Sequence, residues 1–349
     1  MGKLDPRALR PAELARLLNS TPLGEVVGAH TIYRQRNRAG YRVGDGTTVD
    51  LVKYTAWLAR KRHESGDEKQ TGDYESMKDR ARERNARLST SGRDIAPLPE
   101  IVDPDRRRAA GEDFRLFCRK YFPGTFYLPW SGDHEKVVRK IEEAVLHGGL
   151  FALAMPRGSG KTSLCERACI WAILYGHRRF VCLIGSDEGH ARTMLDTIKT
   201  ELESNDRLLE DFPEAVHPVS RLEGIANRCA GQIYAGERTH IEWTAKEIIL
   251  PGISPQEDWW SRPEYEGFLT EGGQSRAGGA ILKVAGITGR IRGMKHQTSS
   301  CESVRPDLVI LDDPQTDESA RSLSQCEARE SILAGAVLGL AGPGRKISG

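Results

Sequence analysis

The residues with the clearest chemical potential form a glycine-rich turn at 156–163, PRGSGKTS. An apolar run precedes this turn and a helical pattern follows it, so the turn is expected to open a helix. Backbone N–H groups in such a position can wrap a phosphate. Lys161 would then reach the β- and γ-phosphates of a nucleotide, and the Thr162 hydroxyl would be offered to Mg²⁺. The expected nucleotide-binding residues are Pro156, Arg157, Gly158, Ser159, Gly160, Lys161, Thr162 and Ser163.

The turn departs at one position from the strict phosphate-binding pattern G-x-x-x-x-G-K-[ST]. Met155 stands where that pattern has its first glycine. The strand–turn–helix context compensates for this departure, so we expect a P-loop that binds ATP with Mg²⁺. The alternative is a chance Gly-Ser-Gly-Lys in a connecting loop.

Two carboxylates follow a second apolar run. In RPDLVILDDPQTDESA, residues 305–320, four strand-forming residues lead into Asp312 and Asp313. A carboxylate at the end of a buried parallel strand beside the P-loop strand can hold Mg²⁺ through water, and Asp312 fits that role. Asp313 is expected to activate the attacking water, at a position where many such ATPases have the longer Glu. The reserve candidates for that role are Asp317 and Glu318. A strand that ends in a solvated acidic turn is the alternative.

A basic, glycine-rich loop lies between these two elements. The stretch GGAILKVAGITGRIRGMKH spans 278–296 and carries Arg290 and Arg292 among its glycines. Such a loop could sense the nucleotide or touch DNA. A solvated loop without a function is the alternative.

Alternating strands and helices are expected to hold these residues in place. Helical patterns cover 161–176 and 187–205, the second with Ser186 or Asp187 as its cap. Short apolar runs typical of buried strands lie at 150–156, 179–186, 241–250, 280–286 and 307–311. This order predicts an α/β fold, with a mostly parallel sheet flanked by helices, as in P-loop NTPases of the ASCE type.

Length and composition exclude several classes of protein. The chain has 349 residues, enough for two or three domains. Its seven cysteines are an odd number without a CxxC pair, which is typical of reduced thiols in a cytoplasmic protein. We find no signal peptide and no apolar run near the roughly 20 residues of a membrane span. No membrane is therefore expected among the partners.

The basic segment 1–62 is expected to form a separate domain that binds DNA. It holds twelve Lys and Arg against five Asp and Glu, an excess of seven positive charges. Helical patterns at 11–19, 29–40 and 49–62 accompany a hairpin expected at 45–46, the layout of a winged helix-turn-helix. The candidate DNA-binding residues on the second helix are Arg34, Arg36 and Arg38. A generic helical bundle with a solvated basic face is the alternative.

A charged segment separates this domain from the rest of the chain. Residues 63–111 are poor in large apolar side chains and are expected to form a linker with one exposed helix at 73–88. The sequence becomes typical of a globular protein at about residue 112, so the ATPase domain is expected at 112–349.

Together these motifs resemble a known family. The P-loop with its arginine, the GITGRIRGMKH loop and the strand end RPDLVILDDPQTDESARS are similar to the ATPase domain of the large terminase subunit of tailed bacteriophages. YFPGTFYLPWSGDHEKVVRKIEEAV also resembles the segment that precedes the P-loop in that family. The resemblance covers roughly 112–349. The N-terminal unit is similar to the winged helix-turn-helix of small terminase subunits.

The resemblance implies an ATP-driven motor that packs viral double-stranded DNA into a procapsid. Such motors assemble as a homo-oligomeric ring on the portal protein, in the cytoplasm of the host. By this resemblance Arg157 is a candidate charge stabiliser at the γ-phosphate. Arg290 or Arg292 would serve the same catalytic purpose, within one subunit or across a subunit boundary.

Two departures from the family qualify this expectation. The small-subunit-like domain is fused to the motor here. Large terminase subunits also continue into an RNase H-like nuclease of about 150 further residues, whereas this sequence stops at AGPGRKISG. We therefore expect an ATPase domain that is incomplete at its C-terminus and has no nuclease activity. A small terminase subunit or a separate nuclease chain would be a partner.

Two alternatives to a packaging motor remain open. One is another P-loop DNA-dependent ATPase, such as a helicase or a plasmid-partition protein. A two-core helicase would need a second α/β core, for which no residues remain. The other is a DNA-binding adaptor whose ATPase fold is inactive.

Overall fold

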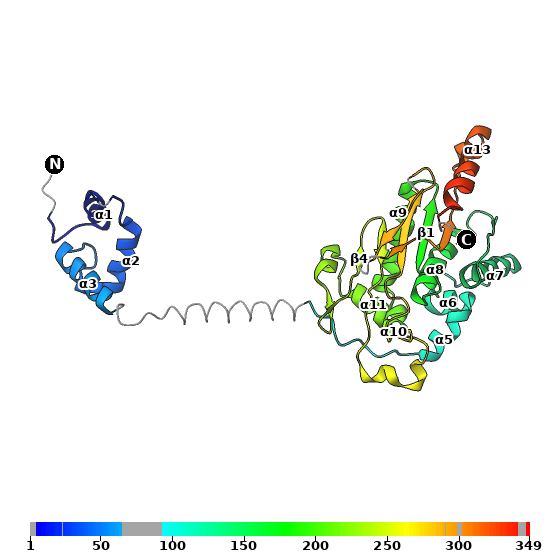
Figure 1. Cartoon of the computed structure of the whole chain (residues 1–349), viewed down its shortest axis with the longest axis horizontal. Helices are drawn as coiled ribbons and strands as arrows, with labels where there is room; N and C mark the ends of the chain where they lie inside the picture. Colours follow the sequence, from blue (N-terminus) through cyan, green and yellow to red (C-terminus); the bar gives the residue numbers. More distant parts are fainter. Residues whose placement is uncertain (1–4, 23, 65–92, 290, 299–301, 341–346) are drawn as a thin grey trace. The chain divides into compact units, whose positions relative to one another are not determined.

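The computed structural model describes residues 5–22, 24–64, 93–289, 291–298, 302–340 and 347–349. The helix expected at 73–88 lies outside the described residues. The chain divides into two compact units, 1–87 and 88–349. Each unit is described by itself (Figure 1).

In the described part of the first unit, helices pack around one small core. The helices are α1 (Pro11–Asn19), α2 (Ala29–Ala39), the 3₁₀ turn η1 (Gly40–Arg42) and α3 (Leu51–Glu64). The three α-helices expected from the sequence are confirmed. Apolar side chains at helical spacing supply the core. Its buried residues are Leu9, Leu14, Ala15, Ile32, Ala39, Val43, Val49 and Tyr54.

The hairpin expected at Asp45-Gly46 does not form a pair of strands. Val49 makes single antiparallel bridges with Gly44 and with Leu9. The Asp45 carboxylate accepts a hydrogen bond from the backbone N–H of Thr47 at 2.8 Å, which closes a tight turn without a ladder. The described residues of this unit therefore show helices and a turn, and no two-stranded wing.

The second unit places a sheet among helices. The helices before and beside the sheet are α5 (Pro104–Glu112), α6 (Phe114–Tyr121), α7 (Gly132–Leu146), α8 (Lys161–Leu174), α9 (Glu188–Ser204), α10 (Asp206–Asp211) and α11 (Pro213–Ser220). Later helical segments are η2 (Ala226–Gly231), η3 (Asp258–Ser261), η4 (Pro263–Tyr265), α12 (Asp317–Ala320), α13 (Leu323–Ile332) and the π-helical η5 (Leu333–Val337). Helix α13 buries none of its side chains and projects from the end of the unit (Figure 1).

The sheet has five strands in the order β4-β5-β6-β1-β9. They are β4 (Glu242–Trp243), β5 (Glu247–Ile249), β6 (Ile281–Gly286), β1 (Phe180–Gly185) and β9 (Leu308–Leu311). Two small antiparallel pairs lie outside it: β2 (Ile233–Tyr234) with β3 (Glu237–Arg238), and β7 (His296–Gln297) with β8 (Ser303–Val304).

The α/β class is confirmed, but the sheet is mixed rather than mostly parallel. Strand β1 pairs in parallel with both β6 and β9, whereas β5 pairs antiparallel with β6 and with β4. The expected run 241–250 turns back on itself at Thr244, whose hydroxyl donates to Glu247 O and accepts from Glu247 N–H. A single long parallel strand cannot form there, because the turn divides the run into two short strands.

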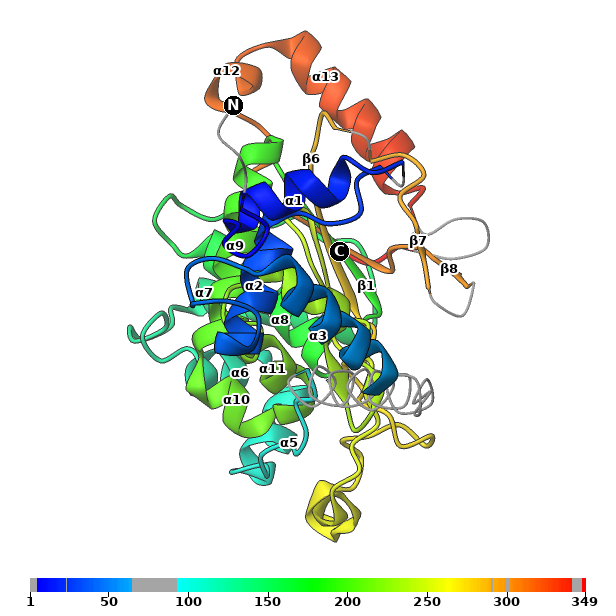
Figure 2. The same ribbon diagram turned by 90° about the vertical axis from the view of Figure 1, so that its left-hand side faces the viewer.

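Strand β1 lies inside the sheet, between β6 and β9, and is buried on both faces. Its odd-numbered residues Val181 and Leu183 pack into a core shared with α6, α8, α9 and α11. Its even-numbered residues Cys182 and Ile184 pack on the other face with Ile287, Val337 and their neighbours. Figure 2 shows α6, α8 and α11 gathered beside β1, on the side opposite β7. This two-sided burial explains the continuous apolar sequence FVCLIG.

Residues 93–111, expected to belong to a linker, lie in the second unit. Helix α5 within that stretch carries two arginines that pair with acids of α10 and α11. Arg106 donates from Nε to Asp211 Oδ2 at 2.6 Å, and Arg107 donates from Nη2 to the fully buried Glu214 at 2.6 Å. The charged composition of this stretch therefore reflects buried ion pairs as well as solvated side chains.

The apolar run expected as the P-loop strand, 150–156, is not a strand, and Leu150 and Leu153 are exposed. Only its first residues approach the sheet: Phe151 N–H donates to Gly349 O at 2.8 Å, and Gly349 N–H donates to Gly149 O at 2.9 Å. Ser348 in turn bridges Leu308 in parallel. Residues 348–349 therefore lie between the start of this run and β9. None of the described helices is both long and apolar enough to cross a membrane.

Candidate functional site

The glycine-rich turn opens α8, as expected from the sequence. Gly158 and Gly160 have φ angles of +75° and +79°, in the left-handed region that favours glycine. Gly160 is the residue that precedes the helix, and Lys161 is its first residue. The Ser159 hydroxyl donates to Pro156 O at 2.6 Å and tightens the turn. The backbone N–H groups that begin α8 have the arrangement that binds anions.

Lys161 and Asp313 meet at the mouth of this turn. Lys161 Nζ lies 2.9 Å from Asp313 Oδ1, and the two side chains are 27% and 58% exposed. The two residues are 152 positions apart in the sequence, so the fold alone brings them together. The structure therefore pairs Lys161, the residue expected to bind phosphate, with Asp313, the residue expected to activate water.

Thr162 and Asp312 form a second, more buried contact beside the first. The Thr162 hydroxyl donates to Asp312 Oδ2 at 2.6 Å, and the Asp312 side chain is only 3% exposed. Cys165 Sγ approaches the other carboxylate oxygen at 3.9 Å. Burial, together with the Asp312 carboxylate, raises the pKa of the Cys165 thiol, which keeps it a neutral donor.

Asp313 has an unusual backbone conformation. Its φ angle is +42°, in the left-handed region that few residues other than glycine adopt. The residue follows directly on Asp312, whose N–H donates to Ile184 O at 2.9 Å and so still belongs to the sheet. The turn of the backbone at Asp313 directs consecutive carboxylates to different partners, Thr162 and Lys161. Strain of this kind is concentrated at functional sites.

Two pockets adjoin the turn. One, of about 210 Å³, is lined by Gly158–Gly160 and by the aromatic side chains of Phe126 and Trp130, with His134. His134 Nε2 lies 3.0 Å from Ser159 O and links this wall to the turn. The other pocket, also about 210 Å³, is lined by Lys161, Asp312, Asp313 and a set of apolar residues. The turn therefore adjoins two different surfaces, a pocket with the aromatic rings of Phe126 and Trp130 and a pocket with the charged side chains of Lys161, Asp312 and Asp313.

Two of the three expected arginines, Arg157 and Arg292, lie in the described part of the chain. Arg157 is exposed in the turn itself. Arg292 is exposed, and its guanidinium lies beside Gly335 in η5. Arg290 lies outside the described residues. The side chains of the reserve acids Asp317 and Glu318, at the start of α12, are not described either.

The three arginines of α2 differ in their surroundings. Arg34 and Arg38 are exposed, four residues apart and thus on one face of the helix. Arg36 is half-buried: its Nη1 donates to Thr47 O at 2.6 Å, and its guanidinium lies 4.7 Å from the centre of the Tyr33 ring. Arg36 therefore holds the turn after α2, and the other two arginines are directed to solvent.

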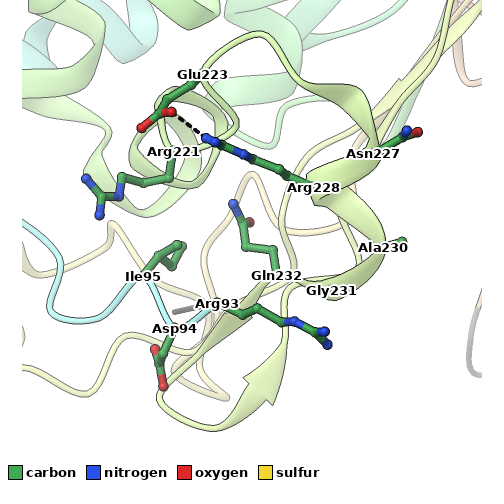
Figure 3. A pocket seen from close by; sticks show the side chains of 10 residues that line it. All are labelled: Arg93, Asp94, Ile95, Arg221, Glu223, Asn227, Arg228, Ala230, Gly231 and Gln232. Atoms are coloured by element: carbon green, nitrogen blue, oxygen red, sulfur yellow. Dashed lines mark hydrogen bonds and ion pairs between the residues drawn. The ribbon is translucent and has the colours of Figure 1, made fainter. Parts of the chain in front are cut away.

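A further depression of the second unit was not anticipated from the sequence. Figure 3 shows its 590 Å³ part, where Arg228 pairs with Glu223 while Arg93 and Arg221 point away from each other. It continues through shared lining residues into a groove of about 1290 Å³ along β4 and β5, which is lined by both apolar and polar side chains. Arg179 in that groove pairs with Glu302 at 3.2 Å. Pairing of this kind reduces the positive charge offered to a ligand.

One residue at the site escaped sequence reasoning. His190, in the first turn of α9, lies with its Nε2 at 3.6 Å from Asp312 Oδ2. The sequence predicted this helix with Ser186 or Asp187 as its cap, and in the structure Asp187 accepts a hydrogen bond from His190 N–H at 2.9 Å. The sequence held no sign that this helix end meets the end of β9, because that contact depends on the order of strands in the sheet.

The donor set fits a magnesium ion with bound nucleotide. A hydroxyl and carboxylates are oxygen ligands, which Mg²⁺ prefers, and Mg²⁺ usually keeps several waters beside one or two protein groups. Thr162 and Asp312 would supply those protein groups. No cluster of three or more His, Cys, Asp and Glu side chains suited to a metal occurs in the part of the chain that the structure describes.

Comparisons with protein-family models, with curated proteins and with solved structures give no match to this chain. The functional argument therefore depends on the residues and their geometry.

Proposed function

We propose that the second unit binds ATP with Mg²⁺ at the glycine-rich turn and hydrolyses it, as a P-loop ATPase. The observation that supports this most directly is the double contact of Lys161 with Asp313 and of Thr162 with Asp312. It joins the start of α8 to the end of β9, the two elements that the P-loop pattern requires to meet. The adjoining aromatic pocket has the character of a site for a flat ring.

In this proposal each residue has a separate task. Lys161 and the backbone N–H groups of 158–162 bind the β- and γ-phosphates and neutralise charge that develops on them. Thr162 and Asp312 would hold the metal, which would supply a Lewis acid for the phosphate oxygens. Asp313, released from Lys161 by the incoming phosphate, accepts a proton from the attacking water. Arg157, which is exposed in the turn, would stabilise the charge that develops at the γ-phosphate.

We further propose that hydrolysis drives the movement of viral double-stranded DNA into a procapsid, in the host cytoplasm. The resemblance of the P-loop, the basic loop and the strand end to large terminase subunits supports this, as does the basic first unit. A homo-oligomeric ring on the portal protein is the assembly that this function requires. The first unit would bring DNA to the motor through Arg34 and Arg38.

The test is ATP hydrolysis by the full chain, measured with and without double-stranded DNA, for the wild type and Thr162→Val. This variant keeps the volume of the side chain and removes only the hydroxyl. We expect DNA to stimulate the wild type, and the variant to lose Mg²⁺-dependent turnover by at least about tenfold. Thr200→Val, on the exposed surface of α9, is the matched control and should behave as the wild type.

The outcomes test the ATP site and the DNA motor separately. Absence of nucleotide binding by the wild type rejects the ATP site. Hydrolysis that DNA and a portal complex do not change rejects the motor and leaves a P-loop ATPase of another kind.

A further inference from the structure

His190 approaches the same carboxylate oxygen that Thr162 uses. Its Nε2 lies 3.6 Å from Asp312 Oδ2, and the Thr162 hydroxyl donates to that oxygen at 2.6 Å. The separation is within the range of an ion pair and slightly longer than a hydrogen bond. Contacts of this length in unliganded sites commonly shorten when the substrate binds. The His190 side chain is 29% exposed, and the Asp312 side chain is 3% exposed.

Two glycines bring His190 to this position. Gly185 and Gly286 are direct partners at the ends of β1 and β6. A Cβ on Gly286 would lie 2.5 Å from Glu188 N, and a Cβ on Gly185 would lie 3.0 Å from His190 Nδ1. Only the absence of both side chains allows the first turn of α9 to rest on the strand ends. The imidazole is therefore held between the Gly185 backbone and Asp312.

The contact has a specific consequence for the carboxylate. Thr162 donates a hydrogen bond to Oδ2, and the His190 ring lies within ion-pair distance of the same oxygen, so both neighbours approach one side of the carboxylate. Within the described part of the chain, the hydrogen-bonding neighbour of the other oxygen, Oδ1, is the weak thiol donor of Cys165, at 3.9 Å. A carboxylate fixed in this way presents Oδ1 in a single orientation.

We propose that His190 is a positioning residue that orients Asp312 for Mg²⁺, and thereby sets the affinity of the site for the metal. This inference rests on the proposed ATP site. His190 itself touches neither nucleotide nor metal in this account. It acts through the neighbouring carboxylate, as residues behind metal ligands commonly do.

The test compares His190→Ala and His190→Gln with the wild type in the full chain. A fluorescent ATP analogue is titrated in the presence of Mg²⁺ and again in EDTA, and Mg²⁺ is titrated at fixed nucleotide. The Gln amide places an N–H donor close to the position of Nε2, so it serves as the conservative variant. Thr200→Ala, on the same helix and exposed, is the matched control.

We expect His190→Ala to weaken Mg²⁺ binding about tenfold or more and to leave nucleotide affinity in EDTA unchanged. His190→Gln should restore most of the Mg²⁺ affinity, because the donor is present again. Unchanged nucleotide affinity in EDTA also shows that the variant is folded.

Other results overturn the inference. Equal Mg²⁺ affinity in all proteins rejects the positioning role while the ATP site stands. Equal losses in the Ala and Gln variants, or a loss in EDTA as well, indicate that the ring only fills space. A wild type that binds no nucleotide under either condition rejects the proposed function itself.

Discussion

Lys161 Nζ lies 2.9 Å from Asp313 Oδ1 across the mouth of the glycine-rich turn. In this arrangement the carboxylate takes the place that a phosphate would occupy beside the lysine. In the proposed ATP site, an incoming nucleotide would have to separate the pair before Lys161 could bind it. The proposal therefore predicts that Lys161 and Asp313 have opposite effects on nucleotide affinity.

Lys161→Ala should abolish tight ATP binding, because it removes the positive charge held against the β- and γ-phosphates. One lost charge-assisted contact costs about 1.5–3 kcal/mol, or about 10- to 150-fold in Kd. Equilibrium titration with a labelled nucleotide measures the loss. Lys136→Ala, on the exposed face of α7, is the control. Unchanged affinity in Lys161→Ala would show that the turn does not bind phosphate.

Substitution of Asp312 and substitution of Asp313 should affect different steps, metal-dependent binding and hydrolysis respectively. Asp312→Asn should weaken Mg²⁺-dependent binding. Asp313→Asn should retain binding, since it frees Lys161, and should slow hydrolysis about 10²- to 10⁴-fold by removing the proton acceptor. Binding and single-turnover rates distinguish the two. If Asp313→Asn hydrolyses ATP at the normal rate and Glu318→Gln does not, the assignment of the acid is wrong.

The first unit should bind duplex DNA by itself. Substituting Arg34 and Arg38 together should weaken binding far more than substituting Arg60 and Lys61, at the end of α3. A fragment of residues 1–87 is titrated against a labelled duplex at several salt concentrations. Log affinity should fall with log salt at a slope of about −0.9 per phosphate neutralised. Binding unaffected by the Arg34 and Arg38 substitutions would assign this unit to protein contacts instead.

His177 should make stability depend on pH. Its Nε2 lies 2.9 Å from Gly111 O, and burial lowers its pKa to about 4, against about 6.5 in the unfolded chain. Between these values the unfolded chain binds a proton that the folded chain excludes, so stability is full above about pH 6.5 and falls towards pH 4. The loss at pH 5 should be about 1–2 kcal/mol.

Chemical unfolding of the wild type and of His177→Gln at pH 7 and pH 5 isolates this effect. Other titrating groups, such as Glu166 with its pKa raised to about 7 by burial, are common to both proteins and cancel in the comparison. The variant should lose less stability on acidification. His147→Gln, at an exposed position, should follow the wild type. An equal loss in all three proteins contradicts the role of His177.

Asp211 should be a strong determinant of stability. It is fully buried and accepts hydrogen bonds from Arg106 Nε and from the Tyr121 hydroxyl, both at 2.6 Å. Asp211→Ala leaves the arginine without its buried partner and should cost about 3–5 kcal/mol. Glu210→Ala removes a more exposed contact of the same arginine and should cost less than about 1 kcal/mol. Denaturation curves with similar midpoints for the two variants would refute this difference.

Local sequence patterns predicted the parts of the site that depend on neighbouring residues. The helix that begins at Lys161, the strands at 180–185 and 308–311, and the Asp187 cap are all present. Each depends on apolar periodicity or on a capping side chain within a few residues. The sequence also predicted that Lys161, Thr162, Asp312 and Asp313 would form one site, because the P-loop pattern implies that its two elements meet.

Features set by long-range packing were not predictable in the same way. The run 150–156 has the composition of a buried strand, yet only Phe151 pairs toward the sheet, and Leu153 is exposed. The antiparallel strands β4 and β5 arise from a turn at Thr244 that the apolar pattern does not reveal. His190 is near Asp312 only because strand order places β9 beside β1.

The contact between Gly286 and α9 links the start of the basic loop to the helix that carries His190. Strand β6 leads at Gly286 directly into the basic loop, and Ile287 N–H donates to Gly185 O at 3.0 Å. Since a Cβ on Gly286 would lie 2.5 Å from Glu188 N, the backbone of β6 packs directly against the backbone of the first turn of α9, with no side chain between them. The first turn of α9, which carries His190, is therefore in direct backbone contact with the residue from which the loop departs. Any side chain at position 286 would displace that turn and, with it, the imidazole beside Asp312.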